Sequence, residues 1–196
     1  MFIDYITLLL VNMVAGFALL AGYVYRGLDN PDRKKWVPGF AMTGLIALVF
    51  GAHMTMTWPV VGPYNSAFGE MSVLFGVIFL GAALAIAMDW SLMTVAVYAF
   101  FAGVAAVVLG VRIIDLKLTK YHYLTGIGYI LSGLGGIFAA PSLVHLGKHR
   151  SYCAVAAGLL AVVALIWAAT AYPAYWAHMK AFSQWVPFTA RGMSGR

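Results

Sequence analysis

The chain has 196 residues, of which 63% are hydrophobic and only 9% are charged, and its formal net charge is +6. A soluble domain carries about 25% charged residues, so this composition excludes a water-soluble globular protein and predicts an integral membrane protein in contact with the lipid bilayer. The basic residues flank apolar stretches, which favours a role in topology and headgroup contact over nucleic-acid binding.

Long apolar segments follow one another along the chain, and each has the length of about 18 to 24 residues that a helix needs to cross a hydrocarbon core of about 30 Å. They are expected at residues 2–25, 39–57, 71–88, 91–111, 122–143 and 152–172, the last one stopped by Pro173. Backbone groups inside a bilayer must be paired internally, so each segment must be helical. The sequence therefore predicts an all-α polytopic bundle of about six membrane-spanning helices over residues 1–173, followed by a short aromatic and basic interfacial tail over residues 174–196.

A histidine stands inside the second predicted span, five residues before Trp58, where a bilayer would surround it. An ionisable residue at such a depth is a functional hypothesis by default. His53 and Met56 are three residues apart and share a helix face. Imidazole with thioether suits copper, and imidazole pairs suit haem iron. A hydrogen bond from His53 to a neighbouring helix is the equally weighted alternative.

Other polar residues are expected at the same end of the bundle. Glu70 begins the third span and His122 begins the fifth, so His53, Met56, Glu70 and His122 are candidate ligands of copper or haem near the outer membrane surface. Glu70 could instead complement a helix dipole, and His122 could belong to an interfacial aromatic belt. His178, after the last span, is the weakest candidate.

The segment WPVVGPYN, residues 58–65, contains two prolines and a glycine and cannot form a regular helix. It is either an exposed turn or a re-entrant cap that lines a cavity. Tyr64, Asn65, Glu70 and Asn12 are therefore the candidate lining of a solute path. For Asn12, a hydrogen bond between helices is the more frequent role of a buried amide.

Small residues recur at helical spacing in the fourth and fifth spans and predict close helix packing. They are Ala99, Gly103 and Ala106 in the fourth span, and Gly128, Ser132 and Gly136 in the fifth. Arg112 and Asp115 are three residues apart and are expected to pair. Four basic residues in the first loop favour an orientation with both termini outside.

Four stretches of the sequence resemble a known family. They are FIDYITLLLVNMVAG (2–16), TWPVVGPYNSAFGE (57–70), VLFGVIFLGAALAIA (73–87) and YAFFAGVAAVVLGVRI (98–113). The chain resembles, over about residues 2–178, small polytopic membrane proteins of bacteria and archaea that are known only as a domain of unknown function. The resemblance implies the fold and a location in the cell (plasma) membrane of a bacterium or archaeon. It implies no activity and no site residues.

The span number also agrees with the small acetate and succinate permeases. Their asparagine-proline-alanine-proline signature is missing, because Asn30-Pro31 leads into Asp-Arg-Lys-Lys, so this likeness concerns architecture alone.

Three functions remain open from the sequence. The chain could be a metal- or haem-binding accessory subunit of a membrane redox complex, with its site around His53. It could be a small-solute or ion permease or channel. It could also be a structural subunit, assembled with other membrane subunits or as a homo-oligomer. No catalytic motif is recognisable, which favours a chain that is not an enzyme by itself.

Overall fold

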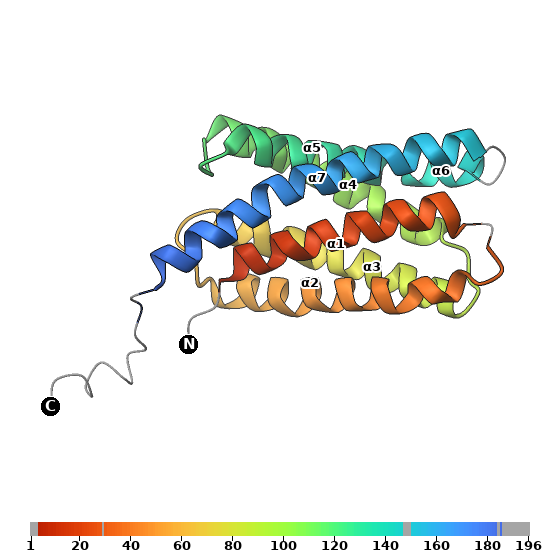
Figure 1. Ribbon diagram of the computed structural model, residues 1–196, viewed down its shortest axis with the longest axis horizontal. Helices are drawn as coiled ribbons and strands as arrows, with labels where there is room; N and C mark the ends of the chain where they lie inside the picture. The colour runs from red at the N-terminus through yellow and green to blue at the C-terminus, as the bar shows by residue number, and fades with distance from the viewer. Residues whose placement is uncertain (1–3, 29, 147–149, 184, 186–196) are drawn as a thin grey trace, which may run out of the picture.

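The computed structural model describes residues 4–28, 30–146, 150–183 and 185, and within these residues the regular structure is entirely helical. The α-helices are α1 (Tyr5–Arg26), α2 (Val37–Thr57), α3 (Met71–Ala87), α4 (Met93–Asp115), α5 (His122–Ile137), α6 (Ala139–Leu146) and α7 (Arg150–Ala181). A 3-10 helix, η1 (Arg33–Trp36), precedes α2, and a π-helix, η2 (Asn65–Glu70), precedes α3. The helices form one elongated bundle (Figure 1). The prediction of an all-α bundle is confirmed.

Five of the described helical segments are long and apolar enough to cross a membrane. They are Tyr5–Arg26, Arg33–Thr57, Asn65–Ala87, Met93–Asp115 and Arg150–Ala181. The chain is therefore a membrane protein by the length and composition of its helices.

The fifth predicted span is not one continuous helix but is divided into α5 and α6, which follow one another along the bundle (Figure 1). Pro141 explains the division. Proline has no N–H to donate to the carbonyl of the residue four positions before it, and its ring collides with that carbonyl. That residue is Ile137, the last residue of α5.

Ion pairs and hydrogen bonds between loops define the two ends of the bundle. At one end, Arg33 and Lys34 contact the carboxylate of Asp89 at 3.0 and 2.7 Å and so join the α1–α2 loop to the α3–α4 loop. At the opposite end, the Tyr64 hydroxyl donates a hydrogen bond to the carbonyl of Leu118 and so joins the α2–α3 loop to the α4–α5 loop. We call these the Asp89 end and the His53 end.

The beginning of α1 and the end of α7 both lie at the His53 end (Figure 1), where His178 contacts Asp4 at 2.7 Å. Because α4 also ends there, the chain returns to the Asp89 end through α5 and α6 before α7 begins. The fifth passage along the bundle is thus made by two shorter helices.

The helix end predicted at Pro173 is wrong, because α7 continues through this proline to Ala181. A proline inside a helix removes one backbone hydrogen bond, and packing against neighbouring helices can compensate for it in a membrane protein. Here α7 packs along α1, one of the most extensive helix contacts of the bundle. The predicted tail over residues 174–196 stays a prediction as a separate unit, and residues 186–196 lie outside the described residues.

Glycines allow α4 and α5 to approach closely, as the small-residue stripes predicted. A Cβ atom added to Gly103 would lie 2.5 Å from the carbonyl oxygen of Gly133, and one added to Gly136 would lie 2.6 Å from that of Ala99. These distances are far below van der Waals contact, so neither glycine can be replaced without moving a backbone.

Candidate functional site

His53 lies on α2 with an exposed side chain, at the surface of the bundle and next to the first turn of α1. Its Nδ1 atom shares a hydrogen bond of 2.8 Å with the hydroxyl of Tyr5, and the two rings stack with centroids 5.5 Å apart. The hydroxyl of Thr57 donates to the backbone carbonyl of His53 at 2.7 Å. His53 therefore makes the hydrogen bond between helices that was the alternative to metal binding.

The other candidate metal ligands also lie at the His53 end of the bundle. No described contact joins any of them to His53. The side chain of Met56 is 81% exposed. Glu70 is exposed and accepts a hydrogen bond of 3.0 Å from a serine one turn earlier, and the half-buried ring of His122 contacts a neighbouring tyrosine. In the described part of the chain, no three His, Cys, Asp or Glu side chains are grouped so that they could hold a metal ion. The copper or haem site stays a prediction.

Asn65 and Tyr64, predicted to line a solute path, hold the loop between α2 and α3 in place. Asn65 is completely buried, its amide oxygen accepts from the N–H of Val60 at 3.2 Å, and its amide nitrogen donates to the carbonyl of the same residue. Tyr64 is bonded to the carbonyl of Leu118. The polar groups of both side chains are thus used within the loops of the His53 end.

Two structural expectations are confirmed. The buried side-chain amide of Asn12 donates a hydrogen bond of 2.9 Å to the backbone carbonyl of Thr43 and so connects α1 to α2. Arg112 and Asp115 form an exposed ion pair near the end of α4.

The start of α1 carries a contact that sequence analysis missed. Asp4 is the N-cap of α1, because its Oδ1 accepts from the backbone N–H of Thr7 at 3.4 Å. Its Oδ2 lies 2.7 Å from Nδ1 of His178, which is also 2.8 Å from the hydroxyl of the completely buried Thr7. A carboxylate can only accept, so His178 donates to Asp4. Asp4 just before an apolar run was a signal for an N-cap, but its partner is 174 residues away.

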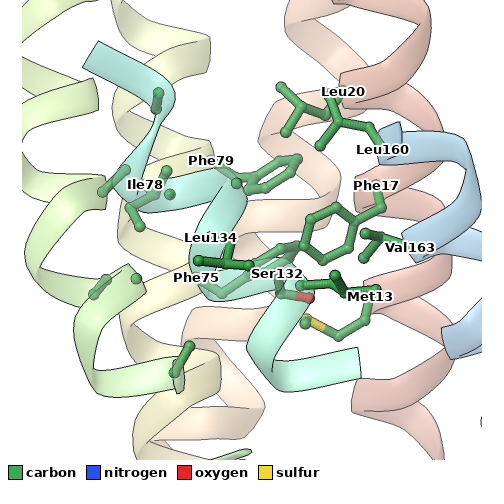
Figure 2. Close-up of a pocket in the computed structure, with 18 of the residues that line it drawn as sticks. Met13, Phe17, Leu20, Phe75, Ile78, Phe79, Ser132, Leu134, Leu160 and Val163 are labelled. Atoms are coloured by element: carbon green, nitrogen blue, oxygen red, sulfur yellow. The ribbon is translucent and has the colours of Figure 1, made fainter. Parts of the chain in front are cut away.

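A cavity of about 540 Å³ lies among the helices, and we call it the central cavity. Figure 2 shows Phe17 of α1, Phe75 and Phe79 of α3, and Leu160 and Val163 of α7 around it. No Asp, Glu, Lys, Arg or His is among the described residues that line it, nor is any residue predicted for a metal site or a solute path. Its volume is in the range of ligand pockets, about 300 to 1,000 Å³.

The pairing of the helices explains why this space is not filled. The most extensive contacts are those of α1 with α7, α2 with α3, and α4 with α5, and the central cavity lies where these pairs meet. Small side chains of α4, such as Ala99 and Ala102, face this space while Gly103 allows close contact with α5. The sequence pattern shows where the small residues are. It does not show which of them a neighbouring helix covers.

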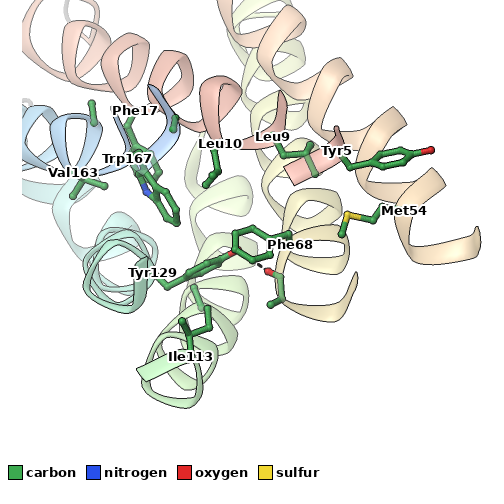
Figure 3. Packing of buried hydrophobic residues seen from close by; sticks show 14 residues of the cluster. Tyr5, Leu9, Leu10, Phe17, Met54, Phe68, Ile113, Tyr129, Val163 and Trp167 are labelled. Carbon is green, nitrogen blue, oxygen red and sulfur yellow. Dashed lines mark hydrogen bonds between the residues drawn. The ribbon is translucent and has the colours of Figure 1, made fainter. Parts of the chain in front are cut away.

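Three side chains at the edge of the central cavity form a hydrogen-bonded aromatic layer: Phe68, Tyr129 and Trp167 (Figure 3). Tyr129 donates to the carbonyl of Ala67 at 2.6 Å, and the indole N–H of Trp167 donates to the hydroxyl of Ser132 at 3.0 Å. Since Ala67 belongs to η2, this layer connects the π-helix to α5 and α7. It lies between the central cavity and the polar contacts of the His53 end.

Part of the lining is exposed on the outside of the bundle. Leu134 and Phe138 are 38% and 59% exposed, and Leu159 and Val162 of α7 are 65% and 49% exposed. The central cavity therefore reaches the surface that the hydrocarbon core of a bilayer would cover.

Comparison with known proteins places the chain in a family. No curated protein and no solved structure matches the chain. The sequence matches a family described as "Protein of unknown function (DUF981)" over residues 1–181, which include all the helices from α1 to α7. The resemblance found in the sequence is thereby confirmed at the level of a family without an assigned function. The chain is an integral membrane protein that belongs to the DUF981 family of proteins of unknown function.

Proposed function

We propose that the protein binds a neutral, apolar molecule that is dissolved in the membrane, and that the central cavity is the binding site. The observation that carries this proposal is a cavity of about 540 Å³ with no Asp, Glu, Lys, Arg or His side chain in its described lining. An apolar pocket of this volume with a few polar groups is a candidate binding site. A charged ligand group would lose its hydration there without gaining a counter-charge, so the ligand is neutral.

The bilayer supplies the ligand in this proposal. The lining reaches the apolar surface at Leu134 and Phe138 on one side and at Leu159 and Val162 of α7. A molecule dissolved among lipid chains can enter there without crossing water. The aromatic layer separates the cavity from the polar His53 end, which supports entry from the side.

A glycine at the edge of the cavity offers a direct test. Gly135 lines the cavity and is exposed, and a Cβ atom added to it would meet only Cδ2 of Leu160, at 3.9 Å. In Gly135→Leu, the new side chain should occupy the entrance of the central cavity without a clash with the backbone. The matched control is Gly158→Leu, because Gly158 is exposed on α7 and a Cβ atom there meets nothing within 4 Å.

The measurement is photolabelling of the protein in lipid nanodiscs with a neutral long-chain alcohol that carries a mid-chain diazirine. We expect wild type and Gly158→Leu to be labelled at cavity residues, and Gly135→Leu to be labelled about tenfold less, since overpacking costs about 1 to 3 kcal/mol. Equal labelling of all three proteins, or labelling spread evenly over the lipid-facing surface, would show that the cavity is not a binding site.

The functions inferred from the sequence stay predictions beside this proposal. An absorption spectrum with elemental analysis of protein purified from its native membrane tests the copper or haem role around His53. A Soret band or a metal content near one per chain that disappears in His53→Ala would support it. Solute or ion flux across the membrane of liposomes that contain the protein tests the permease hypothesis. Co-purification tests whether the chain assembles with other membrane subunits or as a homo-oligomer. The location in the plasma membrane of a bacterium or archaeon is supported by the family resemblance alone.

A further inference from the structure

We propose that the ligand of the central cavity is an apolar alcohol, whose hydroxyl donates a hydrogen bond to the side-chain oxygen of Ser132. This inference rests on the proposed function and names the chemical class of its ligand. It follows from counting the donors and acceptors that the lining offers near Ser132.

The hydroxyl of Ser132 has one acceptor position left. A serine hydroxyl carries one donor and two acceptor lone pairs. The donor of Ser132 is directed to the backbone carbonyl of Gly128, at 2.6 Å, and one lone pair accepts the indole N–H of Trp167, at 3.0 Å. No other hydrogen bond of this hydroxyl is found among the described residues, so the second lone pair can accept one from a ligand. Figure 2 shows the Ser132 side chain among the apolar side chains that line the cavity.

The polar groups next to Ser132 have no donor left for a ligand. The N–H of the completely buried Trp167 is used by Ser132, and the hydroxyl of the buried Tyr129 donates to the carbonyl of Ala67 at 2.6 Å. A ligand carbonyl or ether oxygen at this place would meet an acceptor and would lose its hydrogen bonds. A ligand hydroxyl would find the acceptor it needs.

The rest of the lining suits the hydrocarbon part of such a molecule. Phe17, Phe75 and Phe79 line the same cavity, and Phe75 and Phe79 pack with ring centroids 4.3 Å apart. A long-chain or isoprenoid alcohol presents one hydroxyl, which can meet Ser132, and otherwise only hydrocarbon, which can pack against these rings.

The test compares ligands that differ in one group. Wild-type protein in lipid nanodiscs is photolabelled with the diazirine-bearing alcohol, with its methyl ether and with the ketone of the same length. We expect the alcohol to label cavity residues about fivefold more strongly than the other two, which corresponds to about one net hydrogen bond. In Ser132→Ala the three probes should label equally, at the level of the ether in wild type.

Two further variants keep the test decisive. Ser132→Ala also removes the acceptor of the Trp167 N–H, so Trp167→Phe is measured beside it. This variant leaves Ser132 in place with both lone pairs free, and the preference for the alcohol should persist. Ser66→Ala, a serine of η2 whose hydroxyl donates to Glu70, serves as the control and should keep the wild-type preference.

The outcomes separate this inference from the function on which it rests. If the three probes label wild-type cavity residues equally and Gly135→Leu reduces all of them, the cavity binds apolar molecules but the alcohol assignment is wrong. If no probe labels the cavity in a way that depends on Gly135, the proposed function itself fails. An alcohol preference that survives in Ser132→Ala would also overturn the role of Ser132.

Discussion

Two histidines hold the first turn of α1, one from each of the helices beside it. His53 of α2 is bonded to Tyr5, and His178 of α7 is bonded to Asp4. Asp4 has two roles, because one carboxylate oxygen caps α1 and the other accepts from the imidazole. These contacts fix the start of α1 between α2 and α7.

Removal of the His178 imidazole should therefore weaken the fold. The side chains of His178 and Asp4 are 38% and 28% exposed, so solvent screening reduces the contact, and we expect His178→Ala to lower the free energy of unfolding by about 1 kcal/mol. Unfolding in mixed detergent and lipid micelles, followed by circular dichroism, measures this. His122→Ala is the matched control, since His122 is described only in a ring contact and should cost less. Equal losses would contradict the role of Asp4.

The ion pairs of Asp89 make the stability of the folded protein depend on pH. The hydrogen bond from Lys34, and then that from Arg33, lowers the pKa of Asp89 below its ordinary value of 3.8. A lowered carboxyl pKa stabilises the folded protein above the ordinary pKa, and this contribution is lost as the pH falls through the lowered value.

Asp89→Asn should accordingly reduce the thermal stability slightly at neutral pH, and the difference from wild type should shrink as the pH falls below about 4. The measurement is the midpoint of thermal unfolding at several pH values. Asp32→Asn is the control, because the carboxylate of Asp32 pairs with Lys35, at 3.4 Å, within the same short segment and does not join two loops. A difference that grows on acidification would have the wrong sign for this ion pair.

At the scale of the helices, glycines decide which pairs can touch. The α4–α5 pair has backbones close enough that Gly103 and Gly133 leave no room for a side chain. The same residue type on α7 behaves differently, because Gly158 faces open surface. Composition alone does not distinguish these two kinds of glycine.

The contrast predicts the outcome of two equivalent substitutions. Gly103→Val should lower the free energy of unfolding by about 1 to 3 kcal/mol or prevent folding, because its Cβ atom would lie 2.5 Å from the Gly133 carbonyl oxygen. Gly158→Val should change it by less than about 0.5 kcal/mol. The two variants are compared by their yield of monodisperse protein and by their unfolding in mixed detergent and lipid micelles. Similar losses at both positions would argue against the close α4–α5 contact.

For the whole molecule, the central feature is a cavity that remains between tightly packed helix pairs. A ligand that binds only the folded state stabilises it by an amount that rises with its concentration, about 2.7 kcal/mol at one hundred times Kd. Addition of a neutral long-chain alcohol should thus raise the unfolding midpoint of wild type and of Gly158→Leu. It should not raise that of Gly135→Leu. The same shift in all three would indicate a general effect of the alcohol on the lipid.

The sequence by itself determined the membrane location, the helical class, the approximate spans, the Asn12 contact between helices and the Arg112–Asp115 pair. These depend on local composition, helix period and short spacing, which a single sequence displays directly. Pro141 and Asp4 are also local signals in the sequence, the first for the break between α5 and α6 and the second for the N-cap of α1.

Only the tertiary structure decided which helices pair and therefore what each polar group contacts. The bond between Asp4 and His178 joins residues 174 positions apart, and the side chain of Asn65 is hydrogen-bonded to Val60 within its loop. The central cavity has no sequence signature, because Ala99 and Ala102 would appear identical whether a helix covered them or not. A void is a property of how several surfaces meet, and this is settled only when the helix pairs are packed together.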